Sequence, residues 1–473
     1  MNKTVPGRRI RAAHQAKTAW LTVDERAAQG RALRDAVPRV SHAGWRPASG
    51  RRDPVELLGE SNEGRIPELV PIRFGRMSAS PFAFYRGSAA LMAADLATTP
   101  TSGIRVQACG DAHLMNFGGF ATPERNVIFD INDLDETLPA PFEWDLKRLA
   151  ASVVIAAQHL ELPDSDAARV VTDLVREYRE RMHNYAAMRA LDVWYDRIDL
   201  QKYQDRAADP AIVSAIRKRI AERIEMERRK SVPDHLYPKL VSHEGVMPRI
   251  KDEPPLIFHP TAEQAPGLES GYAAAIASYR DSLPEHIRIL FDRFHFVDMA
   301  VKVVGVGSVG TMCAVCLFMA ADNDPLFLQV KEARASVLDP YAGKSVHANH
   351  GQRVIAGQRA MQAASDLFLG WTRGMNGRDF YVRQLRDMKL SAIIEDWDTA
   401  ILRQYARMCA HALCRAHARS GDAAMIAGYM GAGRTFDDAI CEFATEYSSQ
   451  NRSDYRAFVR AIREGRINAQ IED

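Results

Sequence analysis

The stretch Gly110-Asp111-Ala112-His113-Leu114-Met115-Asn116 places an acid and an amide five positions apart. Alternating residues over 104–108 predict a β-strand that leads into it. In a tight loop after a strand, Asp111 and Asn116 can face one cavity. There the carboxylate accepts a hydrogen bond from a hydroxyl group, and the amide oxygen ligates a divalent metal. The structural alternative is an ordinary β-turn rich in Asp and Asn.

A second acidic stretch follows a second predicted strand at 126–129. This strand delivers a run of acids, Asp130, Asp133, Asp135 and Glu136. An acid just after a buried strand is well placed to hold magnesium on the phosphates of a nucleotide. From about residue 142 the apolar spacing becomes helical. Asp145 therefore lies at the start of a predicted helix, from which it can brace the 110–116 loop.

A third feature, Gly305-Val306-Gly307-Ser308-Val309-Gly310-Thr311, matches the G-x-G-x-x-G pattern. Two β-prone segments follow it, at 312–319 and 326–331, whereas a dinucleotide-binding fold would continue with a helix. The order is therefore strand, glycine turn, strand, turn and a strand that ends in Lys331. Kinases use this order of elements to bind the phosphates of ATP. Glycines let the backbone approach phosphate oxygens, and Lys331 would neutralise the α- and β-phosphates. The alternative is a glycine hairpin with a surface lysine.

Kinases pair this lysine with a glutamate on a helix, but the helix predicted over 348–368 contains no Glu. Glu332 adjoins Lys331 and points to the opposite face of the strand. Three side chains share one face of the predicted helix and are candidate replacements: Gln358, Gln362 and Asp366. The missing glutamate also suggests a second hypothesis, a non-catalytic nucleotide-binding module.

The 110–116 loop, the Asp130 segment and the Asp145-Leu146 helix start together resemble the catalytic segment of the protein-kinase-like fold, in its aminoglycoside and choline kinase branch. The resemblance implies that Asp111 is the catalytic base, and that Asn116 and Asp130 hold Mg²⁺ with Asp133 as a secondary candidate. It implies an ATP site formed by Gly305, Gly307, Ser308, Gly310 and Lys331. The implied activity is ATP- and magnesium-dependent phosphoryl transfer to a hydroxyl acceptor, a small molecule or a protein.

The order of these motifs is unusual, because ordinary kinases carry the glycine loop and lysine before the catalytic loop. The prediction is an α+β, protein-kinase-like two-lobe fold that is circularly permuted and has a large helical insertion. The alternative is that one of the two motifs is accidental. The predicted parts are a basic leader and lead-in (1–75), the catalytic-loop and metal-binding segment (76–160), a helical insertion with a Pro-rich connector (161–290), the nucleotide clamp (291–395) and C-terminal helices (396–473).

A resemblance over nearly the full chain is to the bacterial domain-of-unknown-function family 2252. It is carried by short motifs at 76–77, 80–82, 85–87, 110–116, 132–136, 144–149, 305–311, 329–333, 357–361 and 416–422. This resemblance implies a family and no particular substrate.

Composition narrows the class of protein. The chain has 473 residues, 62 Lys and Arg, 60 Asp and Glu, and a net charge of +2, which argues against nucleic acid as a partner. Six cysteines are too few for a disulfide scaffold, and no apolar run approaches the roughly 20 residues that span a bilayer. A cytoplasmic protein without a membrane partner is expected. Residues 1–52 are strongly basic, which suggests either an anion-binding arm or a solvated leader.

Four smaller patterns complete the sequence analysis. The Gly110-Asp111-x-His113 block also resembles the opening of two-metal phosphoesterases, but the later histidine blocks of such hydrolases are absent. We expect His113 to brace the loop rather than to bind a metal. Cys313 and Cys316 lie three apart on a predicted strand, so they face opposite sides and are expected to pack in the core. Arg86 and Arg383 are candidates for phosphate contact, although an ion pair is the commoner fate of such arginines.

Overall fold

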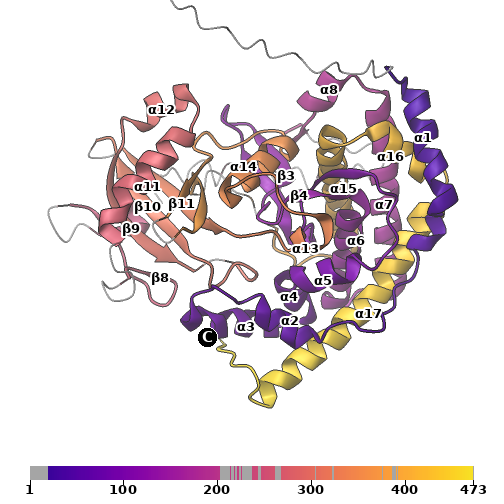
Figure 1. Ribbon diagram of the computed structural model, residues 1–473, viewed down its shortest axis with the longest axis horizontal. Helices are drawn as coiled ribbons and strands as arrows, with labels where there is room; N and C mark the ends of the chain where they lie inside the picture. The colour runs from indigo at the N-terminus through magenta and orange to yellow at the C-terminus, as the bar shows by residue number, and fades with distance from the viewer. Residues whose placement is uncertain are drawn as a thin grey trace, which may run out of the picture.

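The computed structural model combines helices and β-strands, with helices predominating, which agrees with the predicted α+β class (Figure 1). It describes residues 20–471 except for 203–213, 215–217, 219–220, 223–224, 226–236, 243–246, 261–267, 304, 322–323, 375–376, 386–389 and 391. The first 19 residues of the predicted basic leader, and much of the predicted insertion, therefore lie outside the described residues.

The large antiparallel sheet has the strand order β12-β13-β11-β10-β9-β8. Its strands are β8 (Ile257–Phe258), β9 (His295–Lys302), β10 (Cys313–Met319), β11 (Pro325–Ala333), β12 (Gly370–Arg373) and β13 (Asp379–Gln384). The strands β9, β10 and β11 are neighbours, joined by the glycine-rich loop and then by a turn. The predicted succession of strand, glycine turn, strand, turn and strand is thus confirmed.

Side chains on β11 alternate between two environments, as the period of a strand requires. Leu326 and Leu328 pack against α11 (Leu268–Ser282) and α12 (Glu285–Phe291), which cover one face of the sheet (Figure 1). Lys331 lies on the opposite face. The helix α14 (His350–Met361) packs on β11, β12 and β13. It is shorter than the predicted 348–368 helix, because it ends at a C-cap on Gln362.

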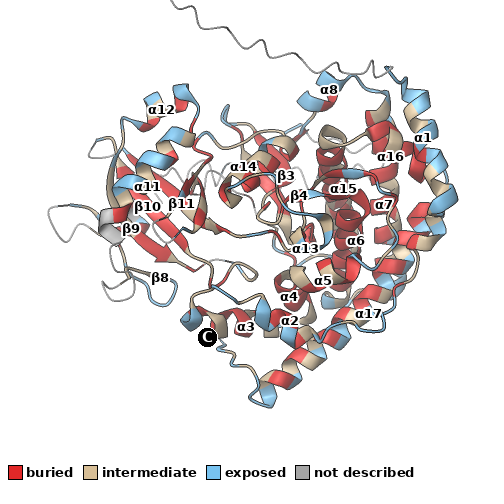
Figure 2. Ribbon diagram, in the orientation of Figure 1, coloured by how far each residue is buried: buried red, intermediate tan, exposed pale blue. Residues whose placement is uncertain are grey.

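The helical part of the chain surrounds α6 (Phe142–His159), which is almost entirely buried (Figure 2). The helices α7 (Asp164–Ala187), α15 (Thr399–Ser420) and α17 (Thr435–Arg463) pack on α6, and α16 (Ala423–Met430) packs on α7. The predicted helix start near residue 142 is confirmed. Because α15 and α17 come from the last third of the sequence, the core around α6 joins segments that are far apart in the chain.

The N-terminal segment consists of short helices: α1 (Val23–Ala36), η1 (Arg39–His42), α2 (Pro54–Glu60), η2 (Pro67–Leu69), α3 (Val70–Ser78), α4 (Pro81–Gly87) and α5 (Ala89–Leu96). Several of its arginines are engaged within the protein. Arg34 and Arg39 donate hydrogen bonds to the carbonyl groups of Tyr429 and Met430 at the end of α16. Arg51 pairs with Asp95 and Asp454. In the described part of the leader, these cations hold other elements of the chain.

Two small sheets place the predicted catalytic loops side by side. β1 (Arg105–Ala108) pairs with β4 (Leu138–Pro141), and β2 (Phe117–Ala121) pairs with β3 (Val127–Ile131). Ala108 lies opposite Leu138, and Phe117 lies opposite Ile131. The loop between β1 and β2, which contains η3 (Leu114–Asn116), therefore lies beside the loop between β3 and β4.

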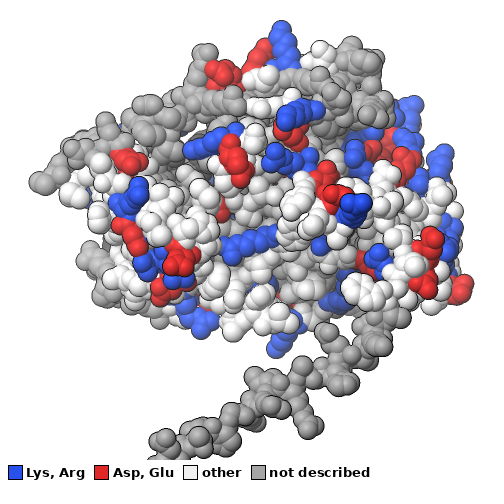
Figure 3. All heavy atoms as spheres, turned by 90° about the horizontal axis from the view of Figure 1, so that it is seen from above, with Lys and Arg blue, Asp and Glu red and all other residues white. Residues whose placement is uncertain are grey.

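The remaining short elements are α8 (Ala190–Tyr195), β5 (Ile198–Asp199), α10 (Tyr237–Leu240), β6 (Val241–Ser242), β7 (Arg249–Ile250) and α13 (Asp339–Ala342). Within the described residues, no helix has both the length and the apolar character needed to cross a membrane. On the face shown in Figure 3, basic and acidic side chains are interspersed, as the nearly balanced composition predicts.

Candidate functional site

Asp145, at the start of α6, braces the loop that carries Asp111. Its two carboxylate oxygens accept hydrogen bonds from the backbone N–H groups of Cys109 at 2.6 Å and Gly110 at 2.9 Å. Gly110 has a φ of +81°, and a Cβ there would lie 2.4 Å from the carbonyl oxygen of Glu136. The loop thus needs glycine at this turn. The brace predicted for Asp145 is confirmed.

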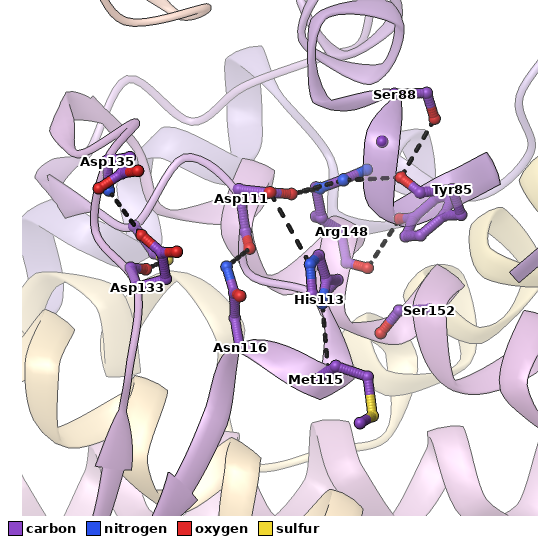
Figure 4. Close-up of polar contacts among 12 residues, drawn as sticks. Tyr85, Ser88, Asp111, His113, Met115, Asn116, Asp133, Asp135, Arg148 and Ser152 are labelled. Carbon is purple, nitrogen blue, oxygen red and sulfur yellow. Dashed lines mark hydrogen bonds and ion pairs between the residues drawn. The ribbon is translucent and has the colours of Figure 1, made fainter. Parts of the chain in front are cut away.

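Asp111 forms a buried ion pair that the sequence did not reveal. Arg148 of α6 donates from Nε to Oδ1 of Asp111 at 2.7 Å (Figure 4). The Arg148 side chain is 2% exposed and that of Asp111 is 20% exposed. Burial raises the pKa of Asp111, although Arg148 opposes the shift. Arg148 follows Asp145 by three positions on one helix, so helical spacing would have placed both side chains near this loop.

The other loop residues have defined roles. The side-chain amide of Asn116 donates to the carbonyl oxygen of Asp111 at 2.8 Å, which fixes its orientation (Figure 4). His113 accepts a hydrogen bond at Nδ1 from the backbone of Met115 at 3.2 Å. The expectation that His113 braces the loop is therefore confirmed.

Lys331 meets the acidic loop between β3 and β4. Its Nζ lies 2.7 Å from Oδ2 of Asp135 and 3.5 Å from Oδ2 of Asp133, and only 3% of the side chain is exposed. Tyr381, opposite Lys331 on β13, donates its hydroxyl to the other oxygen of Asp135. Burial alone would lower the pKa of Lys331, but Asp133 and Asp135 outweigh it and raise the pKa well above its usual value. The lysine is thus a buried, fully charged group.

The predicted partners of Lys331 have other roles. Gln362 donates to the carbonyl oxygen of Ile131 at 2.6 Å, and Asp366 lies beyond α14 and accepts from the backbone of Phe368. The expected pairing of Lys331 with Gln358, Gln362 or Asp366 is therefore wrong, because its ammonium group pairs with Asp135 and Asp133. Glu332 accepts from the backbone N–H of Met312, on the opposite face from Lys331 as predicted.

Asp130 is deeply buried inside β3, and this alters its predicted role. Both of its carboxylate oxygens lie 2.7 Å from Nη2 of Arg415, and one also accepts a hydrogen bond from the backbone N–H of Ala363 at 2.8 Å. Neither side chain of the ion pair is exposed. Metal ligation by Asp130 would break a buried ion pair, which is strongly unfavourable. Asp133, 32% exposed, is the more accessible carboxylate.

The glycine-rich loop lies against the end of α4. Gly305 and Gly310 have positive φ values, +71° and +88°. A Cβ on Gly307 would lie 3.3 Å from the carbonyl oxygen of Arg86, so the loop backbone approaches α4 closely. Arg76 of α3 donates to the carbonyl oxygen of Gly305 at 2.6 Å. The glycine-rich loop, which belongs to the large sheet, therefore contacts α3 and α4, the helices that precede the Asp111 loop in the sequence.

The remaining candidate residues are Arg383 and the two cysteines of β10. Arg383 donates to the side chain of Gln329 at 3.0 Å and to the carbonyl oxygen of Asn132 at 3.4 Å, so it lies between the sheet and the acidic loop. Cys313 and Cys316 are buried on β10, as expected for core residues. Within the described part of the chain, no three His, Cys, Asp or Glu side chains form a metal-binding cluster.

Comparison with known proteins gives one relationship. Residues 65–461 match the family described as "Uncharacterized protein conserved in bacteria (DUF2252)". No curated protein and no solved structure matches the chain.

Proposed function

The chain belongs to this bacterial family, DUF2252, and we propose that it is an ATP- and magnesium-dependent phosphotransferase with a permuted, kinase-like two-lobe fold. The sheet with Lys331 and the glycine-rich loop would hold the nucleotide. The loops with Asp111 and Asp133 would hold the acceptor and the metal. The acceptor would be a hydroxyl compound.

One observation carries the proposal: Lys331 of β11 lies on the acidic loop, 2.7 Å from Asp135. These residues are 196 positions apart, so the two stretches with kinase-like patterns meet in space. The charge of Asp133 raises the pKa of Asp111, so the two carboxylates are near each other. The proposed base therefore belongs to the same group of residues as Lys331. If the glycine-and-lysine pattern or the acidic pattern had arisen by chance, there would be no reason for the two to be in contact.

Each protein group has a chemical task in this proposal. Asp111 would accept the proton of the acceptor hydroxyl, and Arg148 would hold its carboxylate in place. Burial favours this task because a raised pKa makes Asp111 a better base. Lys331 and Arg383 would offset the charge of the nucleotide phosphates. Catalysis would rest mainly on positioning and charge stabilisation.

Asn116 and Asp133 are the residues that would hold magnesium. They fit a hard cation because both offer oxygen ligands, and because Asn116 is held through its nitrogen and keeps its oxygen for other contacts. When bound, the cation would neutralise charge on the phosphates.

The experiment is thermal unfolding of the full chain with ATP, with and without Mg²⁺, together with ADP release. We expect stabilisation that requires Mg²⁺, of about 2.7 kcal/mol at a hundredfold excess over Kd. Asp111→Asn should keep this stabilisation and lose turnover, and Lys331→Met should lose most of the stabilisation. Lys344→Met, at an exposed lysine, is the matched control. Absence of any ATP effect on the wild type would overturn the proposal.

The second candidate is a non-catalytic nucleotide-binding module. It is favoured by the ion pair of Asp111 with Arg148, which occupies one oxygen of the proposed base. This candidate predicts the same Mg²⁺-dependent stabilisation without ADP release. Mg²⁺-dependent cleavage of a simple phosphoester without nucleotide binding would instead support the phosphoesterase hypothesis.

A further inference from the structure

Arg86, in the last turn of α4, carries a charge that the protein leaves without a partner. Its Nε–H group is buried and donates no hydrogen bond to any described residue. Among the residues that the structure describes, its guanidinium group forms no hydrogen bond and no ion pair within 4.0 Å. A partly buried guanidinium without a partner is costly, so such groups are normally paired or face a ligand.

Within the part of the chain that the structure describes, the neighbouring Arg148 has the partners that Arg86 lacks. Arg148 is also buried near Asp111, but it holds the Asp111 carboxylate and donates to the carbonyl oxygen of Tyr85 at 3.0 Å. Asp111 raises the pKa of Arg148 despite burial. Burial lowers the pKa of Arg86, and the more distant charges of Asp111 and Glu395 only partly offset it. Arg148 therefore has a counter-ion within the protein, whereas Arg86 has none among the described residues.

Arg86 also adjoins both parts of the proposed site. Its carbonyl oxygen is 3.3 Å from where a Cβ of Gly307 would be, so it adjoins the glycine-rich loop. Its charge acts on Asp111 and on His113, so it is also near the proposed base. Arg86 is therefore close both to the glycine-rich loop, through its backbone, and to Asp111, through its charge.

We propose that Arg86 binds the terminal phosphate of the nucleotide, the group that is transferred. This inference rests on the proposed function. In the transfer, the bond between the γ-phosphorus and its bridging oxygen breaks, and the electron pair stays with ADP. The acceptor oxygen forms the new bond to phosphorus, and its proton goes to Asp111. Arg86 forms no covalent bond and contacts non-bridging oxygens, where charge is concentrated.

The experiment compares ligands that differ by this phosphate. Calorimetry on the full chain would measure binding of Mg²⁺–ADP and of the Mg²⁺ complex of a non-hydrolysable ATP analogue with a β,γ-imido group. Arg86→Ala should weaken binding of the analogue about ten- to hundredfold, as expected for loss of charge-assisted hydrogen bonds, and change ADP binding less than about twofold. Arg86→Lys should be intermediate.

The matched control is Arg52→Ala, which removes an arginine that pairs with Glu60 at the surface. It should leave both affinities unchanged. Arg86→Ala should not lower the midpoint of thermal unfolding, because the side chain has no partner to lose. If Arg86→Ala weakens ADP and the analogue equally, or neither, the inference is wrong although the proposed function stands. If the wild type binds neither ligand, both fail.

Discussion

Lys331 of β11 and Asp135 of the loop after β3 form an ion pair with 2.7 Å between Nζ and Oδ2, and Tyr381 holds the other oxygen of the carboxylate. The lysine that would contact phosphate is therefore already engaged with an acid. Phosphate oxygens would compete with Asp135 and Asp133 for the same ammonium group. Metal and nucleotide should bind in a coupled way, because a cation on the acidic loop weakens its hold on Lys331.

Asp135→Asn removes the competing charge and tests this coupling. We expect affinity for ATP without Mg²⁺ to rise about tenfold or more, since a hydrogen bond to a charged group contributes about 1.5–3 kcal/mol. The dependence of binding on Mg²⁺ should shrink. Calorimetry at fixed ionic strength measures both. Glu332→Gln, which removes an acid on the opposite face of β11, is the control and should change neither quantity. A lower metal-free affinity in Asp135→Asn would contradict the prediction.

Asp111→Ala should destabilise the protein even apart from any effect on chemistry. It leaves the buried guanidinium of Arg148 without its carboxylate, which costs about 3–5 kcal/mol. The double variant Asp111→Ala/Arg148→Met should recover much of this loss, because it removes the unpaired charge as well. Denaturant unfolding of the two single variants and the double variant measures the coupling. Additive losses would show that the two side chains act independently.

Asp145→Ala should lose turnover while keeping nucleotide binding. Two backbone N–H groups of the Asp111 loop lose their acceptor, and stability should fall by about 2–4 kcal/mol. Asp437→Asn is a control with a similar structural cost, since Asp437 pairs with Arg179 on another face of the helical part. It should lower stability without lowering the turnover of folded protein. Equal loss of turnover in both variants would mean that Asp145 affects activity through stability alone.

A buried pair on α6 should make stability depend on pH. Burial lowers the pKa of Lys147 to about 7, only partly opposed by Glu143, and its Nζ has no hydrogen-bond partner among the described residues. The unfolded chain binds this proton up to its ordinary pKa of about 10.5, so wild-type stability should rise with pH between about 7 and 10.5. At pH 6, Glu143→Gln/Lys147→Met should be about 1–4 kcal/mol more stable than the wild type.

The advantage of that double variant should shrink as the pH rises above 7, and unfolding in denaturant at pH 6, 8 and 9.5 measures it. Glu143→Gln alone should be destabilising, because it leaves Lys147 as the uncompensated cation. A double variant that is less stable than the wild type at every pH would contradict the prediction.

Local patterns predicted the parts of the fold that depend on neighbouring residues. Alternation and turn residues predicted β9, β10 and β11, with the glycine-rich loop between β9 and β10. Helical spacing predicted the start of α6 and the hydrogen bonds by which Asp145 holds the Asp111 loop. Residue spacing could not predict which acid lies opposite Lys331, because Asp135 reaches it only through the packing of a loop on a distant sheet. Asp130 looked like a metal ligand because it follows apolar residues, but its ion pair with Arg415 depends on α15.

The two buried contacts of α15 with the acidic region, Arg415 with Asp130 and His417 with Asp145, span 285 and 272 positions. During synthesis at about 5–20 residues per second, the ribosome would release the segment with Asp130 and Asp145 roughly 15–60 seconds before these partners emerge. Throughout that interval two acids that are buried in the folded protein would face water without their hydrogen-bond partners on α15. The nascent chain would therefore complete the acidic region only after α15 has emerged from the ribosome.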